Sequence, residues 1–278
     1  MSFAKLSGAL LVCDRSAAPA PAAAPLRLVP APPPPRADLP RSNHDRDDTK
    51  RLAHHLKALR LPIFLGEHDR LAEQCAAEGV DYQHFLLRLA ELELGERTRR
   101  SVERRLKTAR FPAMKGFDDF VVDDVPAPAA GMLVKLMRGD FVAHRENVIA
   151  IGPSGCGKTH AAVALGAAAC RRDLAVGFVN AAALVHELRE ACSERRLSQL
   201  QRRYARYRLL IVDDLGAIKL PSDGAELLFH ILCERCERTS TIITSTLPTG
   251  EWSCVFGERL AGTLVDRLSR RGHLLELA

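Results

Sequence analysis

The sequence lacks an apolar run long enough to cross a membrane, and it lacks the cysteine spacing of a disulfide-stabilised domain. The N-terminal run LSGALLVC is too short to span a bilayer, and no convincing signal-peptide cleavage site follows it. The 8 cysteines follow no framework pattern in a chain of 278 residues, so reduced thiols in a cytosol are expected. These absences argue against a membrane protein and against a small secreted scaffold.

An acidic excess is also missing. The chain carries 40 Lys and Arg against 34 Asp and Glu, a formal net charge of +6, which permits a polyanionic partner without requiring one. Cys233 and Cys236 are spaced as C-x-x-C, but no second pair lies nearby, so a metal or redox role is a minor alternative. The length allows one or two domains with a substantial core.

A phosphate-binding motif is present in the context that it requires. Residues 147–151 form a short apolar run typical of a buried strand, and residues 160–165 continue as a small-residue helix. Between them the pattern G-x-x-x-x-G-K-[ST] is complete. The motif comprises Gly152, Pro153, Ser154, Gly155, Cys156, Gly157, Lys158 and Thr159, and His160 extends it into the helix.

This motif predicts a nucleotide site with ATP and Mg²⁺ as its cofactors. Glycines let successive backbone N–H groups turn inward to form a concave anion site, and the helix N-terminus adds the positive end of its dipole. Lys158 can bridge the β- and γ-phosphates, and the Thr159 hydroxyl can ligate Mg²⁺.

A second motif follows the apolar run LLIV. Asp213 and Asp214 end this run, which is typical of a buried parallel strand with carboxylates at the edge where open α/β sheets bind ligands. Asp213 is expected to hold Mg²⁺ opposite Thr159, and Asp214 is expected to polarise the attacking water. A further strand, STIITS, precedes Thr246, whose hydroxyl could bond the γ-phosphate or the water.

Composition divides the chain into three parts. Residues 1–44 are rich in Ala and Pro and are expected to be a disordered tail. Residues 45–112 show helical periodicity and predict a small all-helical domain, and residues 113–278 carry the nucleotide-binding α/β domain.

Within the helical part, apolar residues recur at helical spacing. A first helix is expected to end at Pro62, a second to cover residues 67–78, and a third to begin after Asp81, a plausible N-cap. Phe117 and Phe120, at the start of the α/β domain, are either core aromatics or walls of the adenine pocket. The apolar stripe of the third helix comprises Phe85, Leu86, Leu89 and Leu92.

Two basic stretches are candidates for a nucleic-acid surface. The first covers residues 97–110 of the third helix, where a solvated helix face explains the pattern as well as phosphate contacts do. The second lies in the α/β domain, where the nucleotide state could reposition it, and it is the favoured one. Its candidate DNA contacts are Arg195, Arg196, Arg202 and Arg203.

Several segments together resemble one family. They are GPSGCGKTHAAVAL, LLIVDDLGAIKLPSDGAELLFHIL, STIITSTLPTGEWSCVFGE and LVDRLSRR. The sequence is similar to the transposition helper ATPases called IstB, which are related to DnaC-type helicase loaders. The resemblance covers residues 45–277, and TLPTGEW after the STIITS strand is its most specific element.

The resemblance implies an AAA+ P-loop fold with a parallel five-stranded sheet in the order 5-1-4-3-2. It also implies ATP hydrolysis, ATP-dependent homo-oligomers, largely sequence-independent binding of duplex DNA and a DDE-type transposase of the same element as partner. Arg267 stands where the family places an arginine finger that acts on a neighbouring subunit. A bacterial cytoplasmic protein, nucleoid-associated when bound to DNA, is expected.

Two site residues depart from the family pattern. Asp214 stands where the family most often has Glu, so its carboxylate reaches one methylene less far, and Thr246 stands where Asn is usual. A catalytically inactive scaffold is therefore one alternative. A replicative helicase loader is the main alternative function, and a metabolic P-loop kinase is disfavoured by TLPTGEW and by Arg267.

Overall fold

The computed structural model of the chain describes residues 43–112 and 127–277. Residues 1–42 of the predicted tail, and Phe117 and Phe120, lie outside these described residues. The chain separates into two compact units, 1–52 and 53–278. The first unit contributes only the start of one helix to the described residues, so the following account concerns the second.

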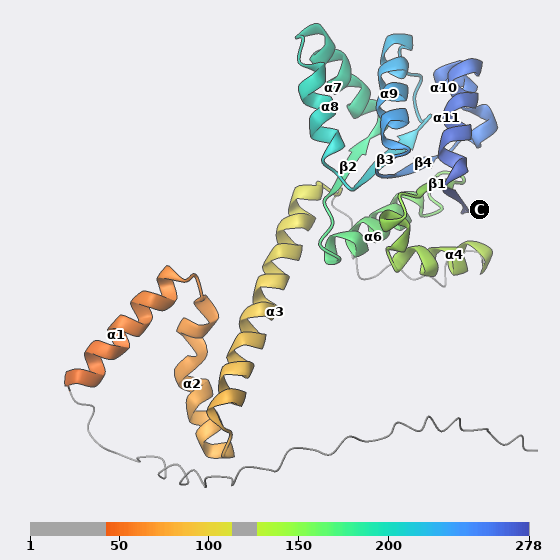
Figure 1. The fold of residues 1–278 in the computed structure, drawn as a ribbon. Coiled ribbons are helices and arrows are strands. Elements are labelled where there is room, and N and C mark those ends of the chain that lie inside the picture. Colours follow the sequence, from red (N-terminus) through yellow and green to blue (C-terminus); the bar gives the residue numbers. More distant parts are fainter. Residues whose placement is uncertain (1–42, 113–126, 278) are drawn as a thin grey trace, which may run out of the picture. The chain divides into compact units, whose positions relative to one another are not determined.

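The elements alternate between strands and helices after residue 146, as expected for an α/β domain (Figure 1). The helices before the sheet are α1 (Asn43–Ala58), α2 (Pro62–Glu78), α3 (Tyr82–Ala109), α4 (Ala127–Met137) and α5 (Asp140–Ala143). The strands are β1 (Asn147–Ile151), β2 (Val176–Asn180), β3 (Leu209–Leu215), β4 (Ser240–Ser245) and β5 (Gly272–Glu276). The remaining helices are α6 (Lys158–Arg171), α7 (Ala181–Ser193), α8 (Leu197–Ala205), α9 (Ser222–Arg235), η2 (Thr249–Glu251), α10 (Ser253–Phe256) and α11 (Glu258–Arg270).

Helices α2 and α3 pair around a small apolar cluster. The Asp81 side chain caps α3 by accepting a hydrogen bond from the His84 N–H at 2.8 Å, as predicted. Helix α2 begins at Pro62, five residues before the predicted start at residue 67, because proline fits the first turn of a helix, where no backbone N–H is needed. Leu71, Cys75 and Leu89 form the buried centre of the cluster.

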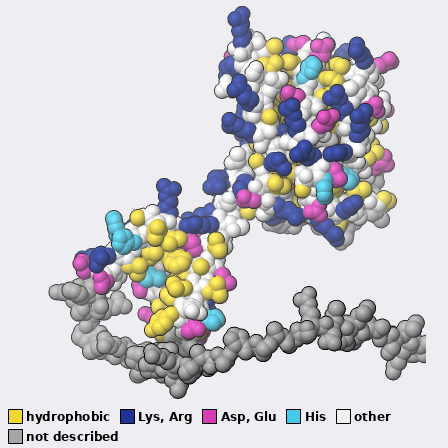
Figure 2. Space-filling model, in the orientation of Figure 1, with side chains coloured by type: hydrophobic (Ala, Val, Ile, Leu, Met, Phe, Trp, Pro, Cys, Tyr) yellow, Lys and Arg dark blue, Asp and Glu magenta, His cyan; other side chains and the backbone are white. Residues whose placement is uncertain are grey.

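The predicted apolar stripe of α3 is only partly buried. Leu89 is buried, but Leu86 is 55% and Leu92 is 44% exposed, so helical periodicity alone did not decide which residues of the stripe are buried. Among the described elements, only α2 packs extensively along the first part of α3, and one helix can cover only one side of another. Figure 2 shows hydrophobic side chains gathered on this helical part.

The sheet has the order β2-β3-β4-β1-β5, and all four strand pairs are parallel. This confirms the predicted order 5-1-4-3-2. Parallel strands place all their carboxyl ends at one edge, which is where such sheets bind ligands. β1, β3 and β4 are adjacent in the centre, so the segments that follow them meet at that edge.

Alternate residues of the strands pack into two hydrophobic cores, one on each face of the sheet. Leu210 and Val212 of β3 pack against α7, α9 and α11, whereas Leu209 and Ile211 pack against α4 and α6. Figure 1 shows these two helical layers on either side of the strands. Side chains of a strand point alternately to its two faces, and both faces of a parallel sheet are covered, so each strand is apolar throughout.

A buried arginine ties the amino edge of the sheet together. Arg235, at the end of α9, is 3% exposed. Its guanidinium donates to the carbonyl oxygens of Tyr204 at 2.6 Å, Tyr207 at 3.2 Å and Ser240 at 2.9 Å. Burial lowers the pKa of Arg235 to about 10. The side chain therefore joins the end of α8 to the start of β4.

Candidate active site and basic groove

The phosphate-binding loop joins β1 to α6 and depends on glycine. Gly155 and Gly157 have φ of +83° and +88°, a region that L-residues with side chains rarely adopt. At Gly152 a Cβ would overlap the carbonyl oxygen of Leu277, because the residue after β5 runs directly beside the loop. Helix α6 begins at Lys158, so its free N–H groups point into the loop.

Lys158 lies inside this loop and is 5% exposed. Its Nζ donates a hydrogen bond to the Pro153 carbonyl oxygen at 2.6 Å and lies 3.7 Å from the Cys156 Sγ. The ammonium is thus held by the loop that would surround the phosphates. A triphosphate oxygen, being negatively charged, would compete for this donor more strongly than a neutral carbonyl does.

Three hydrogen-bonded residues from different elements form the centre of the site. The Thr159 hydroxyl donates to Asp213 Oδ1 at 2.9 Å, and the Thr244 hydroxyl donates to the same oxygen at 2.6 Å. Burial raises the pKa of Asp213, and the two hydroxyl donors oppose that rise without cancelling it. The structure therefore brings the predicted pair Thr159 and Asp213 together, and it adds Thr244 from β4.

Asp214 has a strained backbone. Its φ is +59°, in the left-handed region, and it lies in a bulge where β3 and β4 lose register between Val212 and Leu215. The Asp214 N–H donates to the Thr244 hydroxyl oxygen at 2.9 Å. For a residue other than glycine, the left-handed conformation costs on the order of 1 kcal/mol of folding free energy, and it persists where surrounding contacts hold it.

The residues at this centre suit Mg²⁺. A hydroxyl and a carboxylate are hard oxygen donors, and both lie beside the loop that would carry the phosphates. In the described part of the chain no group of three or more His, Cys, Asp or Glu side chains could hold a metal ion by itself. Mg²⁺ commonly takes one or two protein ligands and completes its shell with phosphate oxygens and water, so Thr159 and Asp213 would suffice.

Thr246 and Arg267 lie at opposite edges of the sheet. Thr246 follows β4 directly, and the register places the preceding Ser245 beside Ile151 and Leu215, so Thr246 lies at the carboxyl edge. Arg267 is exposed near the end of α11, and β5, which begins at Gly272, starts at the opposite edge. The fold therefore keeps Arg267 away from the phosphate loop of its own chain.

Thr244 is the residue of this centre that sequence reasoning missed. It is fully buried inside β4, two positions before Thr246, which follows the strand. A hydroxyl in a strand that is buried on both faces needs a polar partner. That requirement is the signal that could have pointed to Thr244.

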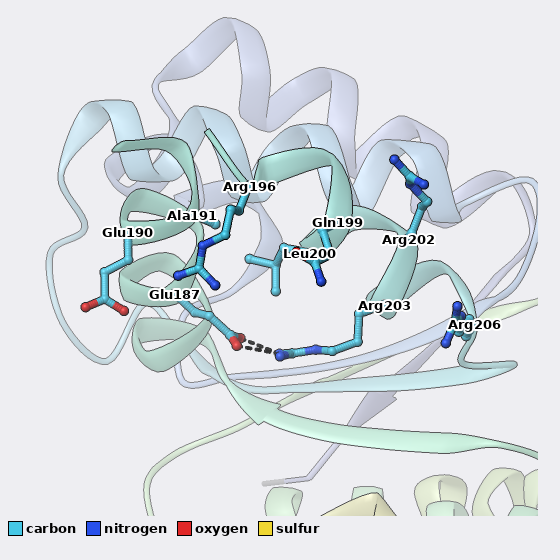
Figure 3. Close-up of a pocket in the computed structure, with 9 residues that line it drawn as sticks. All are labelled: Glu187, Glu190, Ala191, Arg196, Gln199, Leu200, Arg202, Arg203 and Arg206. Atoms are coloured by element: carbon cyan, nitrogen blue, oxygen red, sulfur yellow. Dashed lines mark hydrogen bonds and ion pairs between the residues drawn. The ribbon is translucent and has the colours of Figure 1, made fainter. Parts of the chain in front are cut away.

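A separate basic groove of about 750 Å³ lies between α7 and α8 (Figure 3). Arg196, Arg202 and Arg206 line it, and with Arg203 three of the four predicted DNA contacts lie here, whereas Arg206 was not among them. Arg203 also lines the groove, but both oxygens of Glu187 engage its guanidinium. Arg195 is exposed and is not among the residues lining the groove.

The basic run of α3 is largely paired with carboxylates three or four residues away. Glu96 accepts hydrogen bonds from both Arg99 and Arg100, which lowers the pKa of Glu96 to about 2. Glu103 pairs with Lys107 at 3.1 Å, whereas Arg105 pairs with Asp173, which lies outside the helix. This pattern is typical of a solvated helix face carrying internal ion pairs.

A five-stranded parallel sheet of this order, a glycine loop after β1 and a hydroxyl–carboxylate pair between that loop and β3 define a P-loop ATPase of the AAA+ class. The family profile described as IstB-like ATP binding protein matches residues 54–278. The chain therefore belongs to the IstB-like ATP-binding protein family, and it binds and hydrolyses ATP.

Several relatives of this chain come from insertion sequences. The ATP-binding protein of IS5376 from Geobacillus stearothermophilus is 31% identical over 229 residues, which cover 82% of this chain and 91% of the relative. The ATP-binding protein of IS21 from Pseudomonas aeruginosa is 34% identical over 210 residues, 75% of this chain and 79% of the relative. This chain is accordingly an ATPase associated with insertion sequences.

Solved structures agree with the fold. The AMPPCP-bound replication initiator DnaA from Aquifex aeolicus has a TM-score of 0.51 and 19% identity, over 61% of this chain and 51% of that one. At this identity the likeness concerns the AAA+ fold alone. Among the described residues no helix is both long and apolar enough to span a membrane.

Proposed function

We propose that this chain is the ATP-dependent DNA-binding helper of an insertion-sequence transposition system. It assembles on duplex DNA with ATP, recruits and regulates a DDE-type transposase of the same element, and uses hydrolysis to control that complex in the bacterial cytoplasm. The observation that carries this proposal is the position of the basic groove. Its first helix, α7, starts at the carboxyl end of β2, beside the nucleotide site.

Asn180 connects the nucleotide site to the helices of the groove. It ends β2, pairs in register with Asp213 and caps α7 by accepting a hydrogen bond from the Ala182 N–H at 3.0 Å. A shift at Asp213 when nucleotide and metal bind therefore acts on the residue from which the groove helices extend. This arrangement supports DNA binding that depends on the nucleotide state.

The groove suits a phosphate backbone. Arg196, Arg202 and Arg206 are exposed and come from α8 and the two residues that cap it, and Arg196 also pairs with Glu194. Guanidinium groups at such spacing contact phosphates and release counterions, which gives affinity that falls steeply with salt and depends little on sequence. The paired charges of α3 make that helix the weaker candidate.

In the nucleotide site each residue has a distinct role. The loop N–H groups and Lys158 bind the phosphates, and Thr159 and Asp213 would hold Mg²⁺, which would supply positive charge to neutralise the phosphates. Asp214 orients and polarises the attacking water, and Thr246 acts near the γ-phosphate. Arg267 serves the site of a neighbouring subunit, because it lies far from its own loop.

The test is a salt titration of duplex binding by two matched variants. One replaces Arg196, Arg202 and Arg206 with Ala, and the other replaces Arg99, Arg100 and Arg104 with Ala, so each loses three positive charges. The groove variant should reduce the slope of log affinity against log salt by up to about 0.9 for each lost phosphate contact. The α3 variant should keep the slope.

The opposite result, a lower slope only for the α3 variant, would move the DNA site to that helix. Repeating the titration with single-stranded DNA separates the transposition helper from a helicase loader, since a loader would prefer the single strand. Mixing the protein with the transposase of its own element, with and without ATP, then tests recruitment by co-sedimentation on duplex DNA.

A further inference from the structure

The Thr244 hydroxyl is placed where β3 and β4 lose register. Val212 pairs with Ile243 and Leu215 pairs with Ser245, so Asp213 and Asp214 together face the single residue Thr244. Two residues opposite one make a bulge, and a bulge leaves backbone groups without a ladder partner. Here the side chain of Thr244 supplies hydrogen bonds at the point where the ladder is interrupted.

The hydroxyl makes two hydrogen bonds of opposite sense. Its oxygen accepts from the Asp214 N–H at 2.9 Å, and its proton is donated to Asp213 Oδ1 at 2.6 Å. Thr244 is fully buried, so water does not replace either bond. One side chain thus fixes the backbone of one acid and the carboxylate of the other.

We propose that Thr244 is the positioning residue for ATP hydrolysis. It holds Asp214 in its left-handed conformation and so sets where that short carboxylate can reach, and it fixes Asp213 through Oδ1. It does not itself contact the nucleotide. This inference rests on the proposed role of Asp214 as the group that orients the attacking water.

The geometry makes hydrolysis, rather than ATP binding, the step that depends on Thr244. The phosphate loop and Lys158 belong to β1 and α6 and make none of these bonds. Loss of the hydroxyl releases the Asp214 N–H inside the bulge, and the strained φ of +59° is then free to relax. A carboxylate displaced by about 1 Å orients the water poorly, which lowers turnover by one or two orders of magnitude.

The experiment compares Thr244→Ser with Thr244→Ala, two variants that differ by one hydroxyl. Turnover is measured in the full-length protein against ATP concentration at saturating Mg²⁺. The Ser variant should stay within about threefold of wild type, whereas the Ala variant should lose at least tenfold in kcat with KM changed less than about threefold. If the Ala variant does not fold, Thr244→Val supplies the same comparison.

Thr241→Ala is the matched control. It lies on the same strand and is equally buried, but its hydroxyl accepts a hydrogen bond from the Arg235 Nε at 3.3 Å, at the other edge of the sheet. It should lose stability without the selective loss in kcat. Equal kcat for Thr244→Ala and Thr244→Ser, or an equal loss in Thr241→Ala, would overturn the inference.

Asp214→Asn, measured in parallel, separates this inference from the role on which it rests. If Asp214→Asn turns over ATP normally, Asp214 is not the carboxylate that orients the attacking water, and both statements fail. If Asp214→Asn is slow while Thr244→Ala is normal, only the positioning role of Thr244 fails.

Discussion

The Arg203 guanidinium and the Glu187 carboxylate form an ion pair in which one nitrogen, Nη2, lies 2.5 and 2.6 Å from the two carboxylate oxygens. The Tyr204 hydroxyl donates to the same carboxylate at 2.6 Å. Burial raises the pKa of Glu187, but the hydrogen bonds from Tyr204 and Arg203 outweigh it and leave the pKa below its ordinary value. One acid thus neutralises part of the basic groove.

Glu187→Gln should therefore strengthen DNA binding. The substitution removes a negative charge from the groove and weakens the hold on Arg203, so duplex affinity should rise roughly fivefold at low salt, with a steeper salt dependence. Fluorescence anisotropy with labelled duplex measures both. Glu226→Gln changes the net charge equally at an exposed position of α9 outside the groove lining and should leave affinity unchanged. Weaker binding by Glu187→Gln would count against the groove.

The effect of Glu187→Gln on the free energy of unfolding should depend on pH. A carboxylate with a lowered pKa in the folded state stabilises the protein above its unfolded pKa, near 4.3, and this stability disappears as pH falls through the lower folded pKa. The side chain is about a third exposed, so solvent screening keeps the loss in Glu187→Gln below about 1 kcal/mol at pH 7. Urea unfolding should show the difference at pH 7 and its disappearance towards pH 3.

Lys158→Ala should remove productive ATP binding. The loop loses its buried cation, and a charge-assisted contact of this kind is worth about 2–3 kcal/mol, or about 30- to 150-fold in affinity. Titration calorimetry with a non-hydrolysable ATP analogue measures the loss, and unchanged thermal stability without nucleotide shows that the variant is folded. Near-normal affinity would mean that the loop does not bind the triphosphate as proposed.

Arg235→Met should destabilise the protein by releasing the end of α8, at a position outside the nucleotide site. The carbonyl oxygens of Tyr204, Tyr207 and Ser240 would lose their buried donor, at a cost of about 2–4 kcal/mol in the free energy of unfolding. Arg238→Met changes an exposed neighbour and should cost less than about 0.5 kcal/mol. Equal urea midpoints for both variants would show that Arg235 does not hold α8 to β4.

Arg267→Ala should leave ATP binding intact and remove ATP-dependent assembly. A guanidinium on a neighbour's γ-phosphate is worth about 10³–10⁵ in rate, and ADP offers no γ-phosphate to contact. The decisive measurement mixes Arg267→Ala with Lys158→Ala. A mixed oligomer can place an intact Arg267 against an intact loop and recover some turnover. Mixtures that co-assemble without recovery would argue for a role within one chain.

The sheet was predictable because its signals are local and strong. β1 at 147–151 and β4 at 240–245 coincide with the expected strands, since a strand buried on both faces is a continuous apolar or small-residue run. Helix α8 at 197–205 was not anticipated. Its arginines dominate the composition, and only Leu200 and Tyr204, one turn apart, are buried.

The sequence predicted the site residues that belong to a motif. It did not predict the residue whose role depends on how two strands pair. Thr159 and Asp213 meet because Thr159 starts the helix that follows β1, Asp213 lies towards the carboxyl end of β3, and both strands are central in the sheet. The hydrogen bonds of Thr244 depend on a bulge in β3, and a bulge is decided by the pairing of two strands far apart in the sequence. The domain boundary predicted at residue 112 and the roles of Thr246 and Arg267 stay predictions.

The contact between Gly152 and Leu277 has an evolutionary consequence. The Leu277 N–H donates to the Ile151 carbonyl at 2.8 Å, and its own carbonyl occupies the space beside Gly152 that a side chain would need. The last strand carries no nucleotide motif, yet its path decides whether the first residue of the loop can be anything but glycine. Selection for ATP binding should therefore constrain the backbone course of β5 while leaving its exposed side chains free to drift.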